Sequence, residues 1–437
     1  MNYDHPIVTR ITLDGINFRG GPDVMVGVQG SKGEALRFTE SARRRAAIAA
    51  LGLVAVLTLG ACSSEPTVSA SGPDGGGPVS SETGGKAAAP AKLTYEPAAG
   101  AQEVAPGQPI RVSVADGTLD QVVLTNPEGK QVAGQPSEDK KSWSTTEQLG
   151  YGKAYTWSGK ATGTDGKPVE VGGAFTTVKP RKQVGANINV FDGQTYGIAM
   201  PITLTFPSKV TDKASVEKAL SVETTPKTEG SWAWVHDDTS VHWRPKAYWQ
   251  PGTTVKFNAK IYGVKIGDGV YGKEDRSASF TIGRSQIVKG NTQTHRLLVI
   301  RDGQQIADYA ASYGLDADQG RVTPSGTHVV MSKHDTYSMT NERYNYENIV
   351  VPSAVRFSTN GEFIHGYGPS IWAQGKKNIS HGCVNLAPVN AKEYMAGALV
   401  GDPVEIEGST VKINRARDYS DWTYDWAEWS KLSALAS

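Results

Sequence analysis

The sequence predicts a mainly β protein: two immunoglobulin-like β-sandwich domains, then a mixed, mostly β domain and a short C-terminal extension rich in tryptophan. Its 437 residues include 49 glycines and 23 prolines but only 8% aromatic residues, which predicts many turns. Short stretches in which apolar and polar residues alternate recur from residue 92 onward, as in half-buried strands. The length suits about two to four domains of about 100–200 residues each.

The charge balance argues against a nucleic-acid partner. The 45 basic and 44 acidic side chains leave a net charge of +1, so no general positive field would attract a polyanion. Only two cysteines are present, too few for a scaffold held together by disulfides. We expect neither a metal nor an organic cofactor.

Residues 1–62 are predicted to be a leader and signal peptide. Three arginines, 43–45, precede an uncharged stretch, 46–60, which is shorter than the roughly 20 residues of a membrane span and fits a signal-peptide core. The stretch ends in Leu59-Gly60-Ala61-Cys62, which resembles the bacterial lipobox and implies that Cys62 carries a lipid. We therefore expect the protein to be exported and anchored by its lipid in the cell membrane, facing the cell wall. An ordinary secretory signal or a short anchor helix is the alternative.

Two further segments differ from the folded domains. Residues 1–40 are too polar for a signal peptide, so we expect translation to begin at Met25 or later. Residues 63–91 are rich in Ser, Gly, Pro and Ala and cannot bury a core, which predicts a flexible linker. Such a tether suits a target that lies away from the membrane.

The first immunoglobulin-like domain is predicted over 92–180. Residues 110–114, 155–159 and 174–178 are predicted strands, and Asp165-Gly166 marks a hairpin between the last two. Strands spaced about 8–12 residues apart over about 90 residues are typical of a β-sandwich.

The second immunoglobulin-like domain is predicted over 181–285. Residues 202–206 and 255–259 alternate as strands, and 212–220 are predicted to form a short helix with Thr211 as its N-cap. Its tryptophans could stack on sugars, but packing in the core is the commoner use and we favour it. These residues are Trp232, Trp234, Trp243 and Trp249.

The third domain is predicted over 286–408. Strands at 296–300 and 304–309 are joined by a hairpin at Asp302-Gly303. Further strands are expected within 323–330, 354–357, 362–366 and 379–386, with a helix at 388–399 and a closing strand at 403–406.

Cys383 is the residue of this domain whose chemistry stands out. If Cys62 carries a lipid, Cys383 has no disulfide partner, and a free thiol in an exported protein is a hazard unless it is buried or used. Gly382 allows a close backbone approach, and His365 and His381 are candidate bases for the thiol. A buried structural cysteine is the main alternative. A zinc site of these two histidines and Cys383 is disfavoured because no second cysteine is nearby.

Residues His365-Gly366 and the segment 380–386, Ser-His-Gly-Cys-Val-Asn-Leu, resemble the signature of the L,D-transpeptidase catalytic domain, the YkuD-like family. The resemblance extends over about 290–407 and includes Thr323-Pro324-Ser325-Gly326. The order of lipobox, two immunoglobulin-like domains, catalytic domain and Trp-rich tail is similar to that of the actinobacterial members.

The resemblance implies acyl transfer between peptidoglycan stem peptides. Cys383 would attack the carbonyl of diaminopimelate in a donor tetrapeptide, release D-Ala and form a thioester. The side-chain amine of an acceptor diaminopimelate would then take the acyl group, giving a 3→3 cross-link. Carbapenem-type β-lactams would be inhibitors.

The resemblance also implies roles for single residues. His365 would be the base, with its other ring nitrogen held by a backbone carbonyl near Gly366, where relatives often have Ser. His381 would orient the loop, and the backbone N–H groups of Gly382 and Cys383 would form the oxyanion hole. Of three tyrosines in the stretch that forms the lid, we favour Tyr344 over Tyr337 and Tyr346. The substrate contacts implied are Tyr344, Gly366, Trp372, Ser380 and Asn385.

The C-terminal extension, 409–437, carries Trp422, Trp426 and Trp429 at spacings of four and three, which places them on one face of a helix. We expect it to pack on the third domain as a brace.

Two other functions stay open. An L,D-carboxypeptidase or endopeptidase would use the same Cys383 thioester with water as the acceptor. A non-catalytic wall-binding lipoprotein would have no use for Cys383, His365 and Gly382. A papain-like or NlpC/P60-like peptidase is disfavoured, since in those families the cysteine precedes the histidine in the chain.

Overall fold

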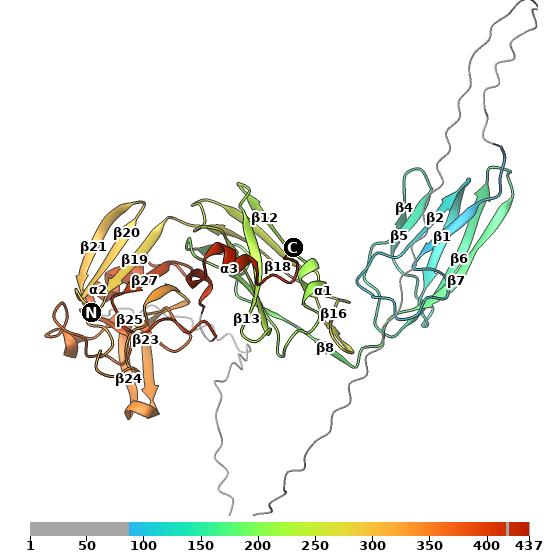
Figure 1. Cartoon of the computed structure of the whole chain (residues 1–437). Helices are drawn as coiled ribbons and strands as arrows, with labels where there is room; N and C mark the ends of the chain where they lie inside the picture. The colour runs from blue at the N-terminus through green and yellow to red at the C-terminus, as the bar shows by residue number, and fades with distance from the viewer. Residues whose placement is uncertain (1–86, 417–418, 437) are drawn as a thin grey trace, which may run out of the picture. The chain divides into compact units, whose positions relative to one another are not determined.

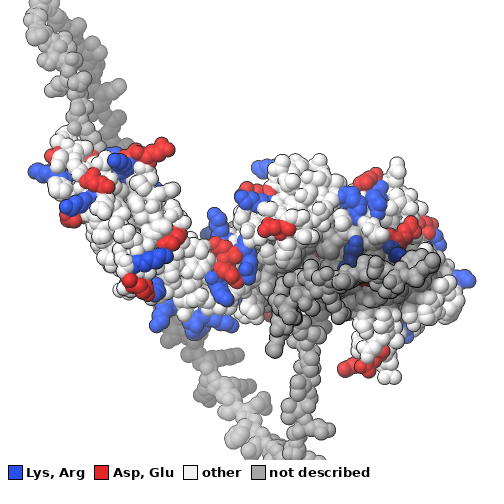
Figure 2. Space-filling model, turned by 180° about the vertical axis from the view of Figure 1, so that it is seen from behind, with Lys and Arg blue, Asp and Glu red and all other residues white. Residues whose placement is uncertain are grey.

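The computed structural model describes residues 87–416 and 419–436 (Figure 1). Cys62, the predicted signal peptide and most of the predicted linker lie outside these residues. Within them the chain is mainly β, as predicted, and no helix is long and apolar enough to cross a membrane. On the face shown in Figure 2, basic and acidic side chains lie among one another.

The first immunoglobulin-like domain has two sheets, of strand order β1-β2-β5-β4 and β3-β6-β7, which share one hydrophobic core. Strand β2 alternates as predicted, with Val112 and Val114 buried and their neighbours more exposed. The strands are β1 (Lys92–Glu96), β2 (Arg111–Ala115), β3 (Gly117–Thr125), β4 (Gly134–Pro136), β5 (Ser142–Thr145), β6 (Ala154–Gly163) and β7 (Pro168–Thr176).

The second immunoglobulin-like domain has two four-stranded sheets, β10-β18-β15-β12 and β13-β14-β11-β9, and a smaller sheet, β16-β17-β8. The strands are β8 (Lys182–Val184), β9 (Asn187–Ile188), β10 (Thr195–Tyr196), β11 (Ile202–Thr205), β12 (Leu220–Thr225), β13 (Gly230–Val235), β14 (Ser240–Pro245), β15 (Thr254–Ala259), β16 (Lys265–Gly267), β17 (Val270–Gly272) and β18 (Arg276–Ile282).

Two predictions for this domain can be compared with the structure. Helix α1 (Lys213–Lys218) is capped by Asp212, whose side chain accepts from the N–H of Ser215, so the prediction of Thr211 as the cap was wrong. The Asp212 carboxylate directly precedes the helix and accepts from the N–H of its third residue, which is the position that an N-cap side chain reaches. The core interpretation of the tryptophans is confirmed, since Trp234, Trp243 and Trp249 are buried in the sandwich core and Trp232 packs against it.

The third domain combines a five-stranded sheet, β21-β20-β19-β27-β22, with a four-stranded sheet, β23-β24-β25-β26. Both sheets are mixed, because β19 pairs in parallel with β27 and β25 pairs in parallel with β26. The elements are β19 (Gln286–Asn291), β20 (Arg296–Arg301), β21 (Gln304–Ala310), β22 (Gly326–Val329), β23 (Ser332–Asn341), η1 (Glu342–Tyr344), β24 (Tyr346–Arg356), β25 (Phe363–Gly366), η2 (Gly368–Ser370), β26 (Val384–Leu386), α2 (Pro388–Gly397) and β27 (Pro403–Glu407).

The register of β25 on β26 brings the predicted site residues to one face. His365 lies opposite Asn385 in this parallel pair, and Cys383 comes two residues before Asn385. Residues paired across neighbouring strands point to the same side of a sheet, so His365 and Asn385 share a face, and Cys383 directly precedes the strand that carries Asn385.

The C-terminal extension contacts two domains. Its start pairs with the third domain, where the N–H of Ser325 donates to the Val411 carbonyl at 2.8 Å. Its helix α3 (Trp426–Ser430) instead packs on β13 of the second immunoglobulin-like domain, where the Trp429 indole donates to the Ser231 carbonyl at 3.0 Å. We expected packing on the third domain, and the extension in fact joins both.

The three tryptophans of the extension gather around one cation rather than along one helix. The Arg244 guanidinium lies 4.7, 5.6 and 4.8 Å from the rings of Trp422, Trp426 and Trp429. Trp422 belongs to the 3₁₀-helix η3 (Asp421–Thr423), which precedes α3. Cation–π contacts of this kind stabilise a buried guanidinium, so the tail is held by its aromatic side chains.

A buried chain of hydrogen bonds also holds the extension against the second immunoglobulin-like domain. Nδ1 of His242 lies 2.8 Å from Oδ1 of Asp421, and Nε2 lies 2.9 Å from Oγ of Ser240. Burial acts to raise the pKa of Asp421, but the neighbouring His242 more than offsets this and the pKa lies below its usual value. All three side chains are buried, so this Ser-His-Asp line braces the structure and offers no substrate access.

Candidate active site

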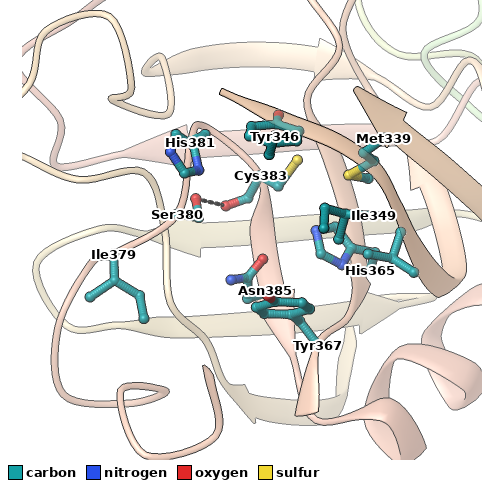
Figure 3. Close-up of a pocket in the computed structure, with 11 residues that line it drawn as sticks. Met339, Tyr346, Ile349, His365, Tyr367, Ile379, Ser380, His381, Cys383 and Asn385 are labelled. Carbon is teal, nitrogen blue, oxygen red and sulfur yellow. Dashed lines mark hydrogen bonds between the residues drawn. The ribbon is translucent and has the colours of Figure 1, made fainter. Parts of the chain in front are cut away.

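A cavity of about 290 Å³ opens beside Cys383 (Figure 3). Its walls come from strands β23 to β26 and from the segment that precedes β26. The lining residues are Met339, Tyr346, Ile349, Val351, His365, Tyr367, Ile379, Ser380, His381, Cys383 and Asn385.

His365 is buried on β25, and its ring has a fixed orientation. Nδ1 lies 3.1 Å from the backbone carbonyl of Gly366, which can only accept a hydrogen bond. Nδ1 therefore carries the proton, and Nε2 keeps its lone pair for another partner. Burial lowers the pKa of His365 to about 4, so the imidazole is neutral at neutral pH.

Cys383 is half-buried, and its sulfur lies 3.9 Å from the carbonyl oxygen of Gly361. Burial raises the pKa of its thiol to about 12, Glu362 adds to the rise, and the backbone N–H of Phe363 opposes it. At neutral pH the pair is therefore a neutral thiol beside a neutral imidazole. A thiolate forms only as a proton leaves the sulfur.

This protonation state predicts the pH dependence of alkylation. The rate at which iodoacetamide modifies Cys383 should rise steadily from about pH 6 to about pH 9, because the thiolate fraction grows tenfold per pH unit below the raised pKa. Alkylation followed by intact-mass spectrometry measures this rate. A plateau near pH 6–7, the sign of a thiolate–imidazolium pair, would contradict it.

The turn before Cys383 is held by two hydroxyl groups. Ser380 Oγ donates to the Cys383 carbonyl at 2.6 Å and accepts from the Gly382 N–H at 3.1 Å. Thr323 Oγ1 donates to the Gly382 carbonyl at 2.7 Å. Gly382 has φ +117°, a conformation that side chains other than glycine rarely adopt.

This hydrogen bonding changes one expectation. The N–H of Gly382 was expected to be an oxyanion donor, but it is bonded to Ser380 Oγ within the turn. That bond leaves the N–H of Cys383 as the donor that the resemblance implies. The Ser380 and Thr323 hydroxyls fix the peptide planes on either side of Gly382 and so set the direction of that N–H.

Replacing Thr323 by valine should slow acylation of Cys383 by about tenfold, because the Gly382 carbonyl loses its hydroxyl donor and the turn loosens. Acylation by a β-lactam under single-turnover conditions measures the effect, with thermal unfolding as a check on folding. The matched control is Thr327→Val on β22. An unchanged acylation rate in a folded Thr323→Val variant would contradict this role.

His381 lies between two lid tyrosines. Its ring centroid is 4.9 Å from that of Tyr344 and 5.2 Å from that of Tyr346. Burial lowers its pKa, and the nearby Arg321 lowers it further, so His381 is also neutral at neutral pH. The Arg321 guanidinium donates to the carbonyls of Ile379 at 2.7 Å and Ser380 at 3.1 Å, which anchors the segment that carries His381.

The structure brings most of the predicted residues together. His365, Ser380, His381, Cys383 and Asn385 line the cavity, and Gly366 and Gly382 adjoin it. Three of the five expected substrate contacts, Tyr344, Gly366 and Trp372, are not among its lining residues. Tyr344 packs against His381 but does not line the cavity, whereas Tyr346 does. Trp372 is 57% exposed with Lys377 Nζ 4.4 Å from its ring centroid.

Sequence reasoning missed the apolar walls and two anchors. Met339, Ile349 and Val351 come from the β23–β24 hairpin, of which only the end, within 354–357, was expected to be a strand; the stretch with the tyrosines was expected as a lid. The roles of Thr323 and Arg321 as anchors of this segment were not predicted, because they depend on contacts with residues far away in the sequence. Within the described residues, no group of three or more His, Cys, Asp or Glu side chains is arranged to hold a metal ion.

The arrangement suits covalent acyl transfer. A thiol and a neutral imidazole with an available Nε2 line one largely apolar cavity, so a proton can pass from sulfur to nitrogen as the sulfur attacks a carbonyl.

Comparisons with known proteins agree with this chemistry. Residues 285–406 match the model of the L,D-transpeptidase catalytic domain, and residues 101–265 match that of a bacterial Ig domain. The chain is 48% identical over 349 residues to L,D-transpeptidase 5 of Mycobacterium tuberculosis (strain ATCC 25618 / H37Rv), covering 79% of this chain and 77% of that protein.

A second curated relative and a solved structure are also similar. L,D-transpeptidase 2 of Mycobacterium tuberculosis (strain CDC 1551 / Oshkosh) is 33% identical over 353 residues, covering 79% of this chain and 85% of that protein. The structure of LD transpeptidase LdtMt1 in complex with imipenem has 31% identity and a TM-score of 0.43, covering 52% of this chain and 99% of that chain.

Proposed function

The chain belongs to the L,D-transpeptidase family and is a peptidoglycan L,D-transpeptidase, and we propose that Cys383 carries the acyl group from the donor stem peptide to the acceptor. One observation carries the proposal. Cys383 and His365 line the same cavity, and the Gly366 carbonyl commits Nδ1 of His365 so that Nε2 is its basic nitrogen.

Acylation begins from the neutral pair. Nε2 of His365 takes the thiol proton as Cys383 Sγ attacks the carbonyl of the third stem residue, diaminopimelate. A C–S bond forms, and the carbonyl electron pair moves to oxygen, where the Cys383 N–H stabilises it. As the carbonyl re-forms, the C–N bond to D-Ala breaks, and the departing nitrogen takes the proton back from His365.

In the second half-reaction, transfer to the acceptor, the sulfur is the leaving group. The side-chain amine of a second diaminopimelate attacks the thioester, the C–S bond breaks, and the sulfur regains a proton through His365. The product is a 3→3 cross-link and a free enzyme. Asn385, Tyr346 and His381 line the cavity that receives the donor stem, and Ser380 fixes the turn beneath it.

Incubation with a disaccharide-tetrapeptide tests this function. We expect a 3→3 dimer together with released D-Ala. Tripeptide monomer as the sole product would contradict cross-linking and favour an L,D-carboxypeptidase with the same thioester. No product and no covalent adduct would favour a non-catalytic wall-binding lipoprotein.

Carbapenem-type β-lactams are the inhibitors we propose. Their strained amide presents an electrophilic carbonyl to the same thiol, and opening of the ring leaves the whole inhibitor bound to sulfur. Intact-mass spectrometry should therefore find an adduct of the full inhibitor mass.

Export and anchoring are also proposed, from the sequence of the leader. The uncharged stretch 46–60 and the lipobox-like Leu59-Gly60-Ala61-Cys62 support lipidation of Cys62 and a position in the cell membrane, facing the wall. Replacing Cys62 by alanine should move the protein from the membrane fraction to the soluble fraction of the cell envelope. Retention of the variant in the membrane fraction would favour anchoring by the signal segment itself.

A further inference from the structure

In the second half-reaction an amine must reach the thioester, and the cavity described above has no charged group to bind that amine. The acceptor amine of diaminopimelate is an ammonium ion at neutral pH, since amines of this kind have pKa values near that of lysine. None of the eleven residues that line the cavity is Asp, Glu, Lys or Arg. Its two histidines are neutral because burial lowers their pKa values. The cavity therefore suits the donor stem better than a cation.

A carboxylate lies on another side of the nucleophile. Glu362 directly precedes β25 and is not among the lining residues. A Cβ atom built on Gly382 would lie 3.2 Å from Cγ of Glu362 and 3.6 Å from its Oε1. The carboxylate thus packs against the glycine that precedes Cys383.

Two backbone carbonyls add to the negative potential on this side. The Gly361 oxygen lies 3.9 Å from Cys383 Sγ. The Arg321 oxygen lies 3.8 Å from the same built Cβ position on Gly382. The Gly361 oxygen therefore faces the sulfur, and the Glu362 carboxylate and the Arg321 oxygen flank the adjoining Gly382, an arrangement of acceptors that attracts an ammonium ion.

The carboxylate is held in place although it works against the first half-reaction. Ser358, which is buried, donates through Oγ to Glu362 Oε2, and the Glu362 N–H donates back to Ser358 Oγ at 3.1 Å. A negative charge at this place adds to the rise in the pKa of Cys383 that burial causes, and so opposes thiolate formation. The position of the Glu362 carboxylate, which opposes acylation, is explained if the carboxylate takes part in the next step, transfer to the acceptor.

We propose that Glu362 determines the acceptor of this transpeptidase: its carboxylate binds the ammonium group of the acceptor stem and brings it to the thioester from the Gly382 side. This rests on the thioester mechanism proposed above. The bound ammonium gives one proton to the carboxylate, which passes it to water. The neutral nitrogen then attacks the thioester carbon, a C–N bond forms, the C–S bond breaks, and the second amine proton reaches the sulfur through His365.

The test compares the two half-reactions in Glu362→Gln, which keeps the shape of the side chain and removes its charge. The matched control is Glu393→Gln, the same change on an exposed residue of α2. One assay follows acylation by a β-lactam, and the other follows the ratio of 3→3 dimer to hydrolysed tripeptide. In Glu362→Gln we expect acylation to be as fast as in the wild type or faster, and the dimer-to-tripeptide ratio to fall about tenfold.

Two additional measurements separate charge from structure. Glu362→Asp should recover part of the dimer-to-tripeptide ratio. Transfer to hydroxylamine, an acceptor without charge at neutral pH, should be the same in Glu362→Gln and the wild type. A wild-type product ratio in Glu362→Gln, or an equal loss of acylation and transfer, would overturn the proposal. A wild type that forms no acyl-enzyme would instead contradict the proposed function.

Discussion

Replacing Cys383 by alanine is expected to abolish both acylation and cross-linking. The sulfur is the atom that forms the covalent bond to the donor stem, and the Ser380 hydroxyl, which also lines the cavity, is hydrogen-bonded to the Cys383 carbonyl. In other enzymes, loss of the covalent nucleophile lowers kcat by about a millionfold. Released D-Ala and 3→3 dimer, followed by chromatography, report turnover, and intact mass after exposure to a carbapenem reports acylation.

The fold should survive this substitution. Cys383 is half-buried, and alanine removes one atom without adding volume, so thermal unfolding should change little. Cys383→Ser is a second variant, because its hydroxyl keeps the size of the side chain and is a far weaker nucleophile than a thiol. Residual D-Ala release at a rate near that of the wild type in either variant would show that another residue carries the acyl group.

Replacing His365 by alanine is expected to slow acylation by about 10²–10⁴-fold, the usual cost of losing a general base. Without the imidazole, attack depends on the small fraction of thiolate that a thiol of raised pKa provides at neutral pH. Single-turnover acylation by a carbapenem measures the rate. The control is His334→Ala, since His334 is bonded to Ser332 and does not line the cavity.

The pH dependence of this variant has a definite sign. Because the pKa of Cys383 is about 12, the acylation rate of His365→Ala should rise about tenfold per pH unit up to the highest pH at which the fold persists. The wild type should depend less on pH, since His365, with a pKa of about 4, stays neutral throughout that range. A near-normal acylation rate in His365→Ala at neutral pH would refute its role as the base.

The mainly β architecture could be predicted because the signals that specify it are local. Alternation of apolar and polar residues and turn residues at short spacing mark strands wherever they occur, as in β2 and in the β20–β21 hairpin. The grouping of His365, Cys383 and Asn385 needed the resemblance of the segment 380–386 to a known family. The parallel pairing of β25 with β26 could not be predicted from a periodic pattern in the sequence.

The details that sequence reasoning missed depend on contacts between distant residues. Thr323 reaches the Gly382 carbonyl from 59 positions away, and Ser380 takes the N–H that was assigned to the oxyanion hole. The preference for Tyr344 over Tyr346 failed because the sequence does not specify which of the two points inward from the lid. The extension was expected on the third domain, and its attachment to Arg244 depends on packing that spacing does not reveal.

The proposed reaction passes through one thioester on Cys383, so the most direct test is to trap it. The purified enzyme would be mixed with a donor tetrapeptide in the absence of an acceptor, quenched in acid after one turnover, and digested for mass spectrometry. We predict the tripeptide acyl mass on the peptide that contains Cys383, and its loss when an acceptor stem is added before the quench. Release of D-Ala with no covalent adduct at Cys383, or an adduct on a different residue, would contradict it.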